Sequence, residues 1–549
     1  MKELRKPSNL DLRDRIRHEL FPALQSSLGK LSPFVSPETN LIAEADKVIE
    51  TVEKSLAPHG KADKSLDIVF LTMIGGHKYL FATEVLLSLI LRNRGHRVRL
   101  VVCDQALPAC EIKKSTNRSS WQRSCAKCWS LGRHLHSSYG LDVVPVSSLF
   151  SEPESKGDSG VLKATVEASL LKHFMVGSLD VIDEGDLSAR EEAYYESAHK
   201  SLAIGSAIAE WKPDRVLMSH GIYSTWGPAR ELLLEKGVSV ATYGKGKKKQ
   251  TIKFNWNTSA DWWDVAEEWK ECSDTPLTKS QQKQIDDYLA SRRDHKKDSL
   301  VYNFGVEQSA EQTKKRLGLD PSKLTFTLFT NVLWDAASAQ REIAFANPIE
   351  WVLETIGWFK NHPKRQLILK IHPAEVVIGT KQPFADIIRA QFPELPENVR
   401  LLEPHEEVNS WSIINVTDLG LVHTSTVGME LPLEGVPVAV VSKTHFRDRG
   451  FTIDVASKQE YFELLEGFSK DHFDIDSLRE KAKRYAFLLF ERYQLPFPFF
   501  EEPNHADVRS FCFSELERIG TSDFAKSFLP TFERGSGSFL LAAGGETGS

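Results

Sequence analysis

The sequence has no run of apolar residues long enough to cross a membrane. A membrane-spanning helix needs about 20 consecutive apolar residues. The N-terminal stretch MKELRKPSNLDLRDRIRHEL is too charged to contain the apolar core of a signal peptide. We therefore expect a cytoplasmic protein, and its basic loops are compatible with peripheral attachment at the inner face of a membrane.

Cysteine is scarce as well, and neither sign of charge is in large excess. Six cysteines in 549 residues exclude a disulfide scaffold and, without an export signal, favour a reducing compartment. Lys and Arg total 69 and Asp and Glu total 75, for a formal net charge of −6. Charge therefore gives no reason to expect a nucleic-acid partner.

What the sequence does contain is an alternation of apolar strand-like runs with helical patterns. Runs such as 65–73, 214–220, 324–331 and 365–372 predict an α/β fold of two Rossmann-like, doubly wound domains. We assign 1–62 to an N-terminal helical extension, 63–300 and 320–470 to the two domains, 471–520 to C-terminal helices and 530–549 to a disordered tail. Ligands of such sheets bind beyond the carboxyl ends of the strands, so the residues there, facing a central cleft, carry the most information.

The first strand of the N-terminal domain is followed by the turn IGGHK. Gly75 and Gly76 allow the backbone to approach a ligand, and His77 and Lys78 open the next helix, whose N-terminus favours an anion. This turn is a candidate acceptor site with His77 in the cleft. The alternative is an ordinary tight turn, because a lone Gly-Gly pair is a weak signal.

Two further stretches of this domain end strands. In SHGIYSTWG, His220 is a candidate catalytic residue and Trp226 a candidate stacking face for a sugar, unless the tryptophan belongs to the core. YGKGKKKQTIK, which contains Lys245, has five lysines in eleven residues. We interpret it as a mobile loop over an anionic ligand, with a plain solvated loop as the alternative.

In the C-terminal domain the sharpest signal is LKIHPAE. Pro373 restricts the backbone of His372 to an extended conformation at the end of an apolar strand, where an imidazole can donate to a phosphate oxygen or protonate it. Glu375 follows two residues later. Asp335, just past another strand, is a candidate for a sugar hydroxyl or for a helix cap.

HTSTVGMELPLEGVPVAV supplies a second polar strand end. Thr424, Ser425 and Thr426 offer three hydroxyls and backbone N–H groups to an anion. Gly428 permits close approach, and Glu430 lies on the same helical side as Thr426, where it could bind a ribose. The alternative is an ordinary Ser/Thr helix cap.

A basic loop and a cluster of cysteines are two further candidate binding sites. In SKTHFRDRGFTID, Lys443 and Arg447 belong to a basic loop suited to a phosphate or an acidic sugar, or simply to the surface. Four cysteines cluster in the N-terminal domain, and the CAKC pair has the spacing of a zinc knuckle or redox pair. A structural zinc or iron–sulfur site is therefore an alternative to no metal at all; the four residues are Cys103, Cys110, Cys125 and Cys128.

Together these motifs resemble those of bacterial capsule and surface-polysaccharide biosynthesis proteins, which are GT-B glycosyltransferases related to Kdo transferases. TNVLWDAA, PIEWVLETI, LKIHPAE, TDLGLVHTSTVGMELPLEGVPVAV and HFRDRGFTID carry the resemblance, which extends over about 65–470. The nucleotide sites of bacterial sialyltransferases and CDP-glycerol polymerases are similar too. The resemblance implies that His372, Ser425 and Thr426 hold the donor phosphate and that Glu430 binds ribose, with Pro432 departing from the pattern.

The resemblance implies a glycosyltransferase that moves a sugar, such as Kdo or a related acid, from a nucleotide-activated donor, preferably a CMP-sugar. The acceptor would be a capsule or surface glycan or a glycolipid. Candidate catalytic residues are His77, His220, Asp335 and His372. No Asp-x-Asp motif follows a strand, so no metal cofactor is expected to be required. The alternatives are a CDP-alditol phosphotransferase and a non-catalytic nucleotide- or glycan-binding member of a polysaccharide assembly complex.

Overall fold

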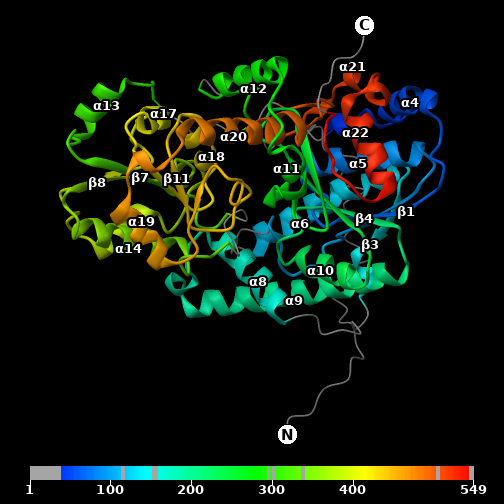
Figure 1. The fold of residues 1–549 in the computed structure, drawn as a ribbon. Helices are drawn as coiled ribbons and strands as arrows, with labels where there is room; N and C mark the ends of the chain where they lie inside the picture. Colours follow the sequence, from blue (N-terminus) through cyan, green and yellow to red (C-terminus); the bar gives the residue numbers. More distant parts are fainter. Residues whose placement is uncertain are drawn as a thin grey trace.

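The computed structural model describes residues 39–112, 118–150, 159–293, 297–299, 305–335, 341–502 and 507–542, apart from the side chains of 39, 118–123 and 159. Two lobes, each built on its own sheet, stand side by side (Figure 1). Within these residues, no helix combines the length and apolar character that a membrane crossing requires.

The N-terminal domain is built on a seven-stranded sheet with the order β13-β6-β5-β4-β1-β2-β3. The strands are β1 (Asp67–Thr72), β2 (Arg97–Val102), β3 (Asp142–Pro145), β4 (Arg215–Ser219), β5 (Val240–Lys245), β6 (Thr251–Trp256) and β13 (Leu495–Pro496). The first five are parallel, and β6 returns antiparallel to β5. All but the first residue of β1 are buried, as expected of a parallel strand covered on both faces.

Helices surround this sheet. They are α3 (Thr39–Ala43), α4 (Ala45–Leu56), α5 (Lys78–Asn93), α6 (Arg118–Gly132), α7 (His134–Ser137), α8 (Ser159–Phe174), α9 (Glu184–Glu210) and α10 (Gly227–Glu235). Helix α5 is buried continuously from Tyr79 to Leu91, since α4 and the C-terminal part of the chain pack over it. Within the expected helical extension, α3 and α4 cover 39–43 and 45–56, while residues 1–38 lie outside the described residues.

The C-terminal domain has a six-stranded parallel sheet with the order β12-β11-β10-β7-β8-β9. The strands are β7 (Leu324–Phe329), β8 (Arg365–Lys370), β9 (Val399–Leu402), β10 (Leu419–Val422), β11 (Val438–Val440) and β12 (Ile453–Asp454). In chain order this reads 3-2-1-4-5-6, the order of a dinucleotide-binding sheet. The predicted pair of Rossmann-like domains, and with it the GT-B fold class, is confirmed.

Two hydrophobic clusters cover the faces of this second sheet. One contains Phe326, Leu328 and Leu369, and the other contains Phe329 and Val422. The surrounding helices are α11 (Ala266–Cys272), α12 (Lys279–Arg292), α13 (Ala310–Leu317), α14 (Pro348–Lys360), α15 (Ala374–Ile378), α16 (Phe384–Gln391), α17 (Ser410–Ile414), α18 (Val427–Leu433), α19 (Lys458–Gly467) and α20 (Ile475–Phe487). Helix α18 spans only seven residues and ends one residue after Pro432, as expected of a helix that contains a proline.

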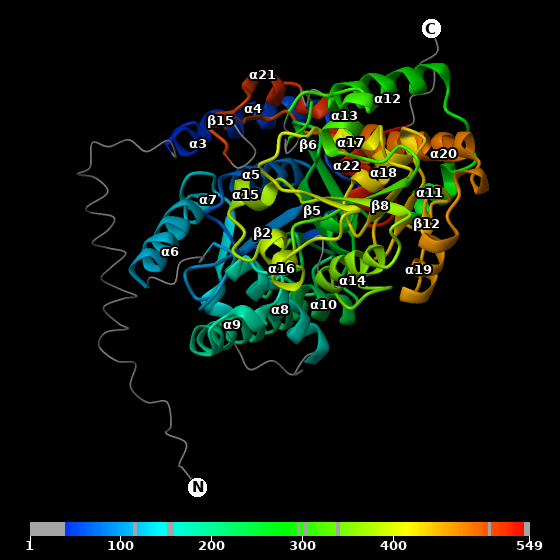
Figure 2. The same ribbon diagram turned by 90° about the vertical axis from the view of Figure 1, so that its left-hand side faces the viewer.

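The last part of the chain returns to the N-terminal domain. After α20 and a π-helical turn (Leu488–Arg492), β13 pairs with β6, and α22 (Asp523–Arg534) packs beside β13 in the right-hand lobe of Figure 1. Glu533 near the end of α22 pairs with Arg94, directly after α5, at 2.8 Å. Between β13 and α22 in the chain come a short ribbon of β14 (Phe500–Glu501) and β15 (Ser510–Phe511) and the helix α21 (Phe513–Leu516). Strand β15 and α21 lie against α3 and α4 (Figure 2).

Two expectations about the end of the chain are therefore wrong. The segment 471–520 is not wholly helical, because it contains β13, β14 and β15. The predicted disordered tail begins inside α22 and continues to Phe539, which is buried against Phe254 and Phe528 in the aromatic core of the N-terminal domain. Residues 543–549 lie outside the described residues.

Candidate active site at the junction of the domains

The carboxyl ends of the two sheets meet around a hydrogen bond that joins the domains. The ammonium of Lys247 donates to the hydroxyl of Thr426 at 2.6 Å. Lys247 lies in the turn between β5 and β6, and Thr426 directly precedes α18. The lysine-rich stretch predicted to be a mobile loop is thus a β-hairpin, and one of its lysines reaches the hydroxyl cluster of the other domain.

On the N-terminal side, His220 follows β4 and pairs with a carboxylate. Its backbone has φ +54°, and Gly221 follows with φ +72°, so the chain turns sharply as it leaves the sheet. The Nδ1 of His220 lies 2.5 Å from Oδ2 of Asp261, and the Nζ of Lys253 donates to the other carboxylate oxygen at 3.3 Å. Burial opposes ionisation of Asp261, but His220 and Lys253 outweigh it and hold the pKa of the carboxyl well below its usual range.

Asp261 fixes the tautomer of the histidine. Because an ionised carboxylate only accepts hydrogen bonds, Nδ1 of His220 must carry the proton. Nε2 is then the basic nitrogen. The side chain of His220 remains 36% exposed, so this nitrogen is within reach of a ligand.

His77, the candidate from the glycine turn, lies beside this pair at the N-terminus of α5. Burial, aided by the neighbouring His220 and Lys245, lowers the pKa of His77 to about 4. The imidazole is therefore neutral near pH 7. Its Nδ1 is buried and has no hydrogen-bond partner among the described residues.

On the C-terminal side, His372 occupies the strand end that its sequence motif predicts, directly after β8. The N–H of Ala374 donates to Nδ1 of His372 at 3.1 Å, and the hydroxyl of Thr330 accepts from the N–H of His372 at 2.9 Å. Burial and the nearby charges of Lys247 and Lys370 lower the pKa of His372 to about 4. The ring is thus neutral, and because Nδ1 is an acceptor, Nε2 carries the proton.

Glu430, the predicted ribose ligand, is buried near the same junction, with 6% of its surface exposed. Its carboxylate accepts from the guanidinium of Arg292, which also contacts Asp298 at 3.4 Å. Tyr288 donates to Asp298 at 2.8 Å. This buried network balances charges beneath Lys247 and fixes the position of Glu430.

An aromatic ring lies close to two lysines of the β5–β6 hairpin. Trp263 has φ +54° and presents its ring to Lys253 at 4.3 Å and to Lys247 at 5.8 Å, measured from Nζ to the ring centroid. The ring of His445 stacks against Trp263 with centroids 5.3 Å apart. Cation–π attraction therefore holds two ammonium groups in place without neutralising them.

The C-terminal side carries further buried nitrogen atoms. Arg341 lies over the ring of Trp262 at 4.6 Å, and burial lowers its pKa to about 10. Nε of Arg341, Nδ1 of His423 and Nε2 of His445 are buried without a hydrogen-bond partner among the described residues. The junction is thus rich in donors and positive charge, which suits a multiply charged anion.

Several predicted site residues are used structurally instead. Trp226, a candidate for sugar stacking or for the core, belongs to the core: it is 1% exposed, donates to the carbonyl of Leu71 and packs edge-on against His220. Glu375 is 2% exposed and accepts from the N–H of Phe384 at the start of α16. The guanidinium of Arg447 donates to the carbonyls of Val440 and Val455, so it joins β11 to the end of β12.

The remaining candidates are placed as follows. Gly428 packs against Phe446, since an added Cβ would lie 2.6 Å from that ring, so its close approach is to protein. Lys78 pairs with Asp507 at 2.9 Å, and Lys245 pairs with a glutamate of the C-terminal segment, Glu502. Lys443 is exposed.

The rest of the predicted set lies at or near the junction. Ser425 is buried and Thr424 is partly buried beside Thr426. Asp335 is exposed, and its charge acts on Lys253. The Gly75–Gly76 turn packs on α6.

Sequence reasoning missed Asp261, Lys253 and Arg292. Lys253 stands in TIKFNW, an alternating pattern typical of a strand, and this pattern could have revealed β6. Asp261 follows Ser259, whose hydroxyl accepts its N–H, in the short motif SADWW. Arg292 ends α12, and nothing local connects it to Glu430, which is 138 residues away along the chain.

The described side chains form no site for a single metal ion. Among them, no three His, Cys, Asp or Glu residues are grouped so as to hold a metal ion. The four clustered cysteines line one pocket of the N-terminal domain, next to the Gly75–Gly76 turn.

No protein-family model matches the chain, and no curated protein does. Among solved structures, the chain is similar to KpsC of Thermosulfurimonas dismutans in two forms. The β-Kdo 2,4 transferase is 15% identical over 49% of this chain and 79% of that chain, with a TM-score of 0.32. The β-Kdo 2,7 transferase is 14% identical over 58% and 88%, also with a TM-score of 0.32.

A UDP-GlcNAc 2-epimerase from Neisseria meningitidis, bound to UDP-GlcNAc, is 12% identical over 77% of this chain and 99% of that chain, with a TM-score of 0.24. At such scores none of these similarities carries an argument about function.

Proposed function

We propose that this protein is a glycosyltransferase that moves a sugar from a nucleotide-activated donor to an acceptor hydroxyl, with a surface glycan or glycolipid as the acceptor class. One observation carries the proposal. Lys247 of one domain and Thr426 of the other share a hydrogen bond next to His372, at the carboxyl ends of both sheets. A phosphate at that point would be bound by both domains at once.

The donor phosphate would be held by three different donors. Lys247 supplies a charge, Thr426 a hydroxyl and His372 the Nε2–H that its backbone bond leaves as the ring donor. Donors placed in advance where negative charge develops lower the barrier to loss of the phosphate leaving group. Ser425 would add a further hydroxyl, and Glu430, fixed by Arg292, would face the ribose.

The acceptor would be activated from the N-terminal side. Nε2 of His220 takes the proton of the acceptor hydroxyl, and Asp261 stabilises the imidazolium that results. The acceptor oxygen then forms a bond to the anomeric carbon, the bond from that carbon to the phosphate oxygen breaks, and the nucleotide leaves with the electron pair. His77, neutral and adjacent, would orient the acceptor.

Nucleotide binding and turnover test the two halves of this proposal separately. Thermal-shift measurements with CMP, CDP, UDP and GDP should show stabilisation by at least one nucleotide, and this shift should shrink in Lys247→Met. Nucleotide release from a panel of nucleotide sugars, CMP-Kdo among them, should then require an acceptor glycan. Binding without turnover would contradict the enzyme assignment, and a product that retains donor phosphorus would indicate a phosphotransferase.

A further inference from the structure

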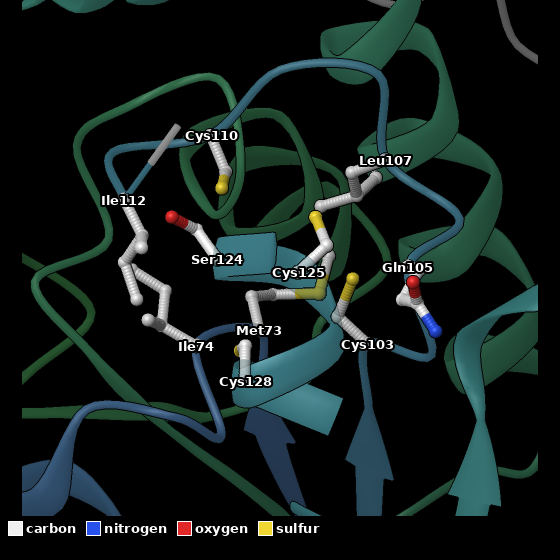
Figure 3. Close-up of a pocket in the computed structure, with 10 residues that line it drawn as sticks. All are labelled: Met73, Ile74, Cys103, Gln105, Leu107, Cys110, Ile112, Ser124, Cys125 and Cys128. Carbon is white, nitrogen blue, oxygen red and sulfur yellow. The ribbon is translucent and has the colours of Figure 1, made fainter. Parts of the chain in front are cut away.

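A pocket in the N-terminal domain gathers four of the chain's six cysteines (Figure 3). Cys103 directly follows β2, Cys110 belongs to the loop after it, and Cys125 and Cys128 lie one turn apart on α6. No disulfide joins any of the six cysteines. The proposed transfer reaction uses none of these four thiols.

The chemistry of the lining is selective. Apart from the thiols, the pocket is lined mainly by apolar side chains such as Met73 and Leu107, with Gln105 and Ser124 as its polar members. No carboxylate or imidazole is among the described lining residues. Four sulfur ligands in such surroundings suit a thiophilic centre and disfavour Mg²⁺ or Ca²⁺, which prefer oxygen.

The spacing that thiolate ligands need distinguishes a site for a single metal ion from a site for a cluster. Two sulfurs bound to one tetrahedral zinc at about 2.3 Å lie roughly 3.8 Å apart. The described side chains contain no three such ligands close enough to hold one ion. Instead, the four cysteines line one pocket together with six other residues, and the empty space there, open solvent included, is about 350 Å³. A four-iron cluster bridges four thiolates that are farther apart than those on a single ion.

A backbone hydrogen bond to one of the sulfurs also favours a cluster. The N–H of Gly76 donates to Sγ of Cys128 at 3.1 Å. Hydrogen bonds of this kind to ligand sulfurs are among the features that tune iron–sulfur clusters. A Cβ added at Gly76 would lie 2.4 Å from Cα of Cys128, so the turn packs directly on α6.

We infer that this pocket holds a four-iron, four-sulfide cluster ligated by Cys103, Cys110, Cys125 and Cys128. Its role is structural and needs no electron transfer. It ties the end of β2, the following loop and α6 together, and through the Gly76–Cys128 bond it supports the turn that carries His77. This inference is independent of the proposed transferase activity.

Metal analysis of the full chain tests the inference without reference to activity. The protein is produced in iron-supplemented cells and purified without oxygen. We expect about four iron and four sulfide per chain and a visible absorption that dithionite bleaches. Cys125→Ser and Cys128→Ser should each lose most of the iron, whereas the controls Cys272→Ser and Cys512→Ser, which alter cysteines outside the pocket, should keep it.

Three outcomes would overturn the assignment. They are one zinc per chain without sulfide, a disulfide between pocket cysteines in metal-free protein, and failure to gain iron when the anaerobic protein is incubated with ferrous iron and sulfide. If the serine variants do not fold, Mössbauer spectroscopy of the unsubstituted protein labelled with ⁵⁷Fe decides the cluster type. A spectrum without four-iron signals would reject the proposal.

Discussion

Two histidines, His220 and His372, end parallel strands on opposite sides of the junction, and they are prepared for opposite tasks. Asp261 lies 2.5 Å from Nδ1 of His220 and leaves Nε2 as a base. For His372, a backbone N–H donates to Nδ1 and leaves Nε2 as a donor. In each histidine, the hydrogen bond that Nδ1 makes thus decides whether Nε2 accepts or donates a proton.

In the proposed transfer, two sheets of similar topology would divide one reaction between them. The N-terminal domain has a carboxylate next to its strand-end histidine, so it can store a proton. In the C-terminal domain the nearby carboxylate, Glu430, is engaged by Arg292, and the strand-end histidine lies beside ammonium groups. The environment there suits a phosphate and excludes a positively charged imidazole.

The most damaging single change should be His220→Ala. Removing a general base lowers turnover by about 10²–10⁴-fold, and we expect the upper end of that range because Asp261 would then lose its partner as well. Nucleotide affinity, measured by isothermal titration calorimetry, should change by less than about twofold.

The control for this change is His199→Ala, which removes an exposed histidine from α9 of the same domain. It should leave both turnover and affinity unaltered. If His220→Ala weakened nucleotide binding as strongly as turnover, the two histidines would share one role and the contrast would be lost.

Arg292→Leu should destabilise the protein by about 3–5 kcal/mol, because it leaves the buried charges of Glu430 and Asp298 without their cation. Thermal unfolding should show a clearly lower transition temperature. Arg293→Leu is the matched control: the neighbouring arginine pairs with Glu307 and Glu434 at 37% exposure, so its loss should cost less than about 1 kcal/mol. Equal effects of the two substitutions would contradict the buried network.

His372→Ala should lower turnover by about 10²–10³-fold and weaken nucleotide binding, since a donor to the leaving phosphate is lost. The pKa of His372, about 4, means that its contribution should be constant between pH 6 and 9. His372→Gln, which keeps an N–H donor, should recover part of the activity. His405→Ala, on the exposed surface of the same domain, should behave like the unsubstituted protein.

The parallel strands were predictable because burial on both faces gives nearly continuous apolar runs, as in β8 (RQLILK). His372 was predictable because Pro373 marks the end of that strand. The hairpin of β5 and β6 was not predictable, because five lysines in eleven residues are typical of a solvated loop. Only Lys253 among them is fully buried, and its burial depends on partners elsewhere in the chain. Lys253 is held by Asp261 and Trp263, and this arrangement appears only once the strands pair.

The pairing of distant segments was also invisible in the sequence. Leu495–Pro496 is too short to predict as a strand, and it becomes β13 because β6 offers it an edge. The sequence around Trp226 fits either a surface that stacks on a sugar or a core residue. Only its packing against His220 in the fold shows that it belongs to the core. Local patterns therefore located the strand ends, and tertiary contacts determined which side chains remain available for a ligand.

The smallest effect concerns pH. Burial, together with the positive charge of Arg292, lowers the pKa of Lys247 to about 8. The protonated lysine attracts phosphate and the neutral lysine does not, so nucleotide affinity should be full below pH 8 and should fall by up to about tenfold per unit as the pH rises above it. Lys247→Met should bind the nucleotide weakly at every pH.

Burial also lowers the pKa of Lys370 to about 8, so Lys370→Met serves as the control. If Lys370→Met abolished the pH dependence and Lys247→Met kept it, the charge that recognises phosphate would belong to β8 of the C-terminal domain alone, and the bridging role of the hairpin would be rejected.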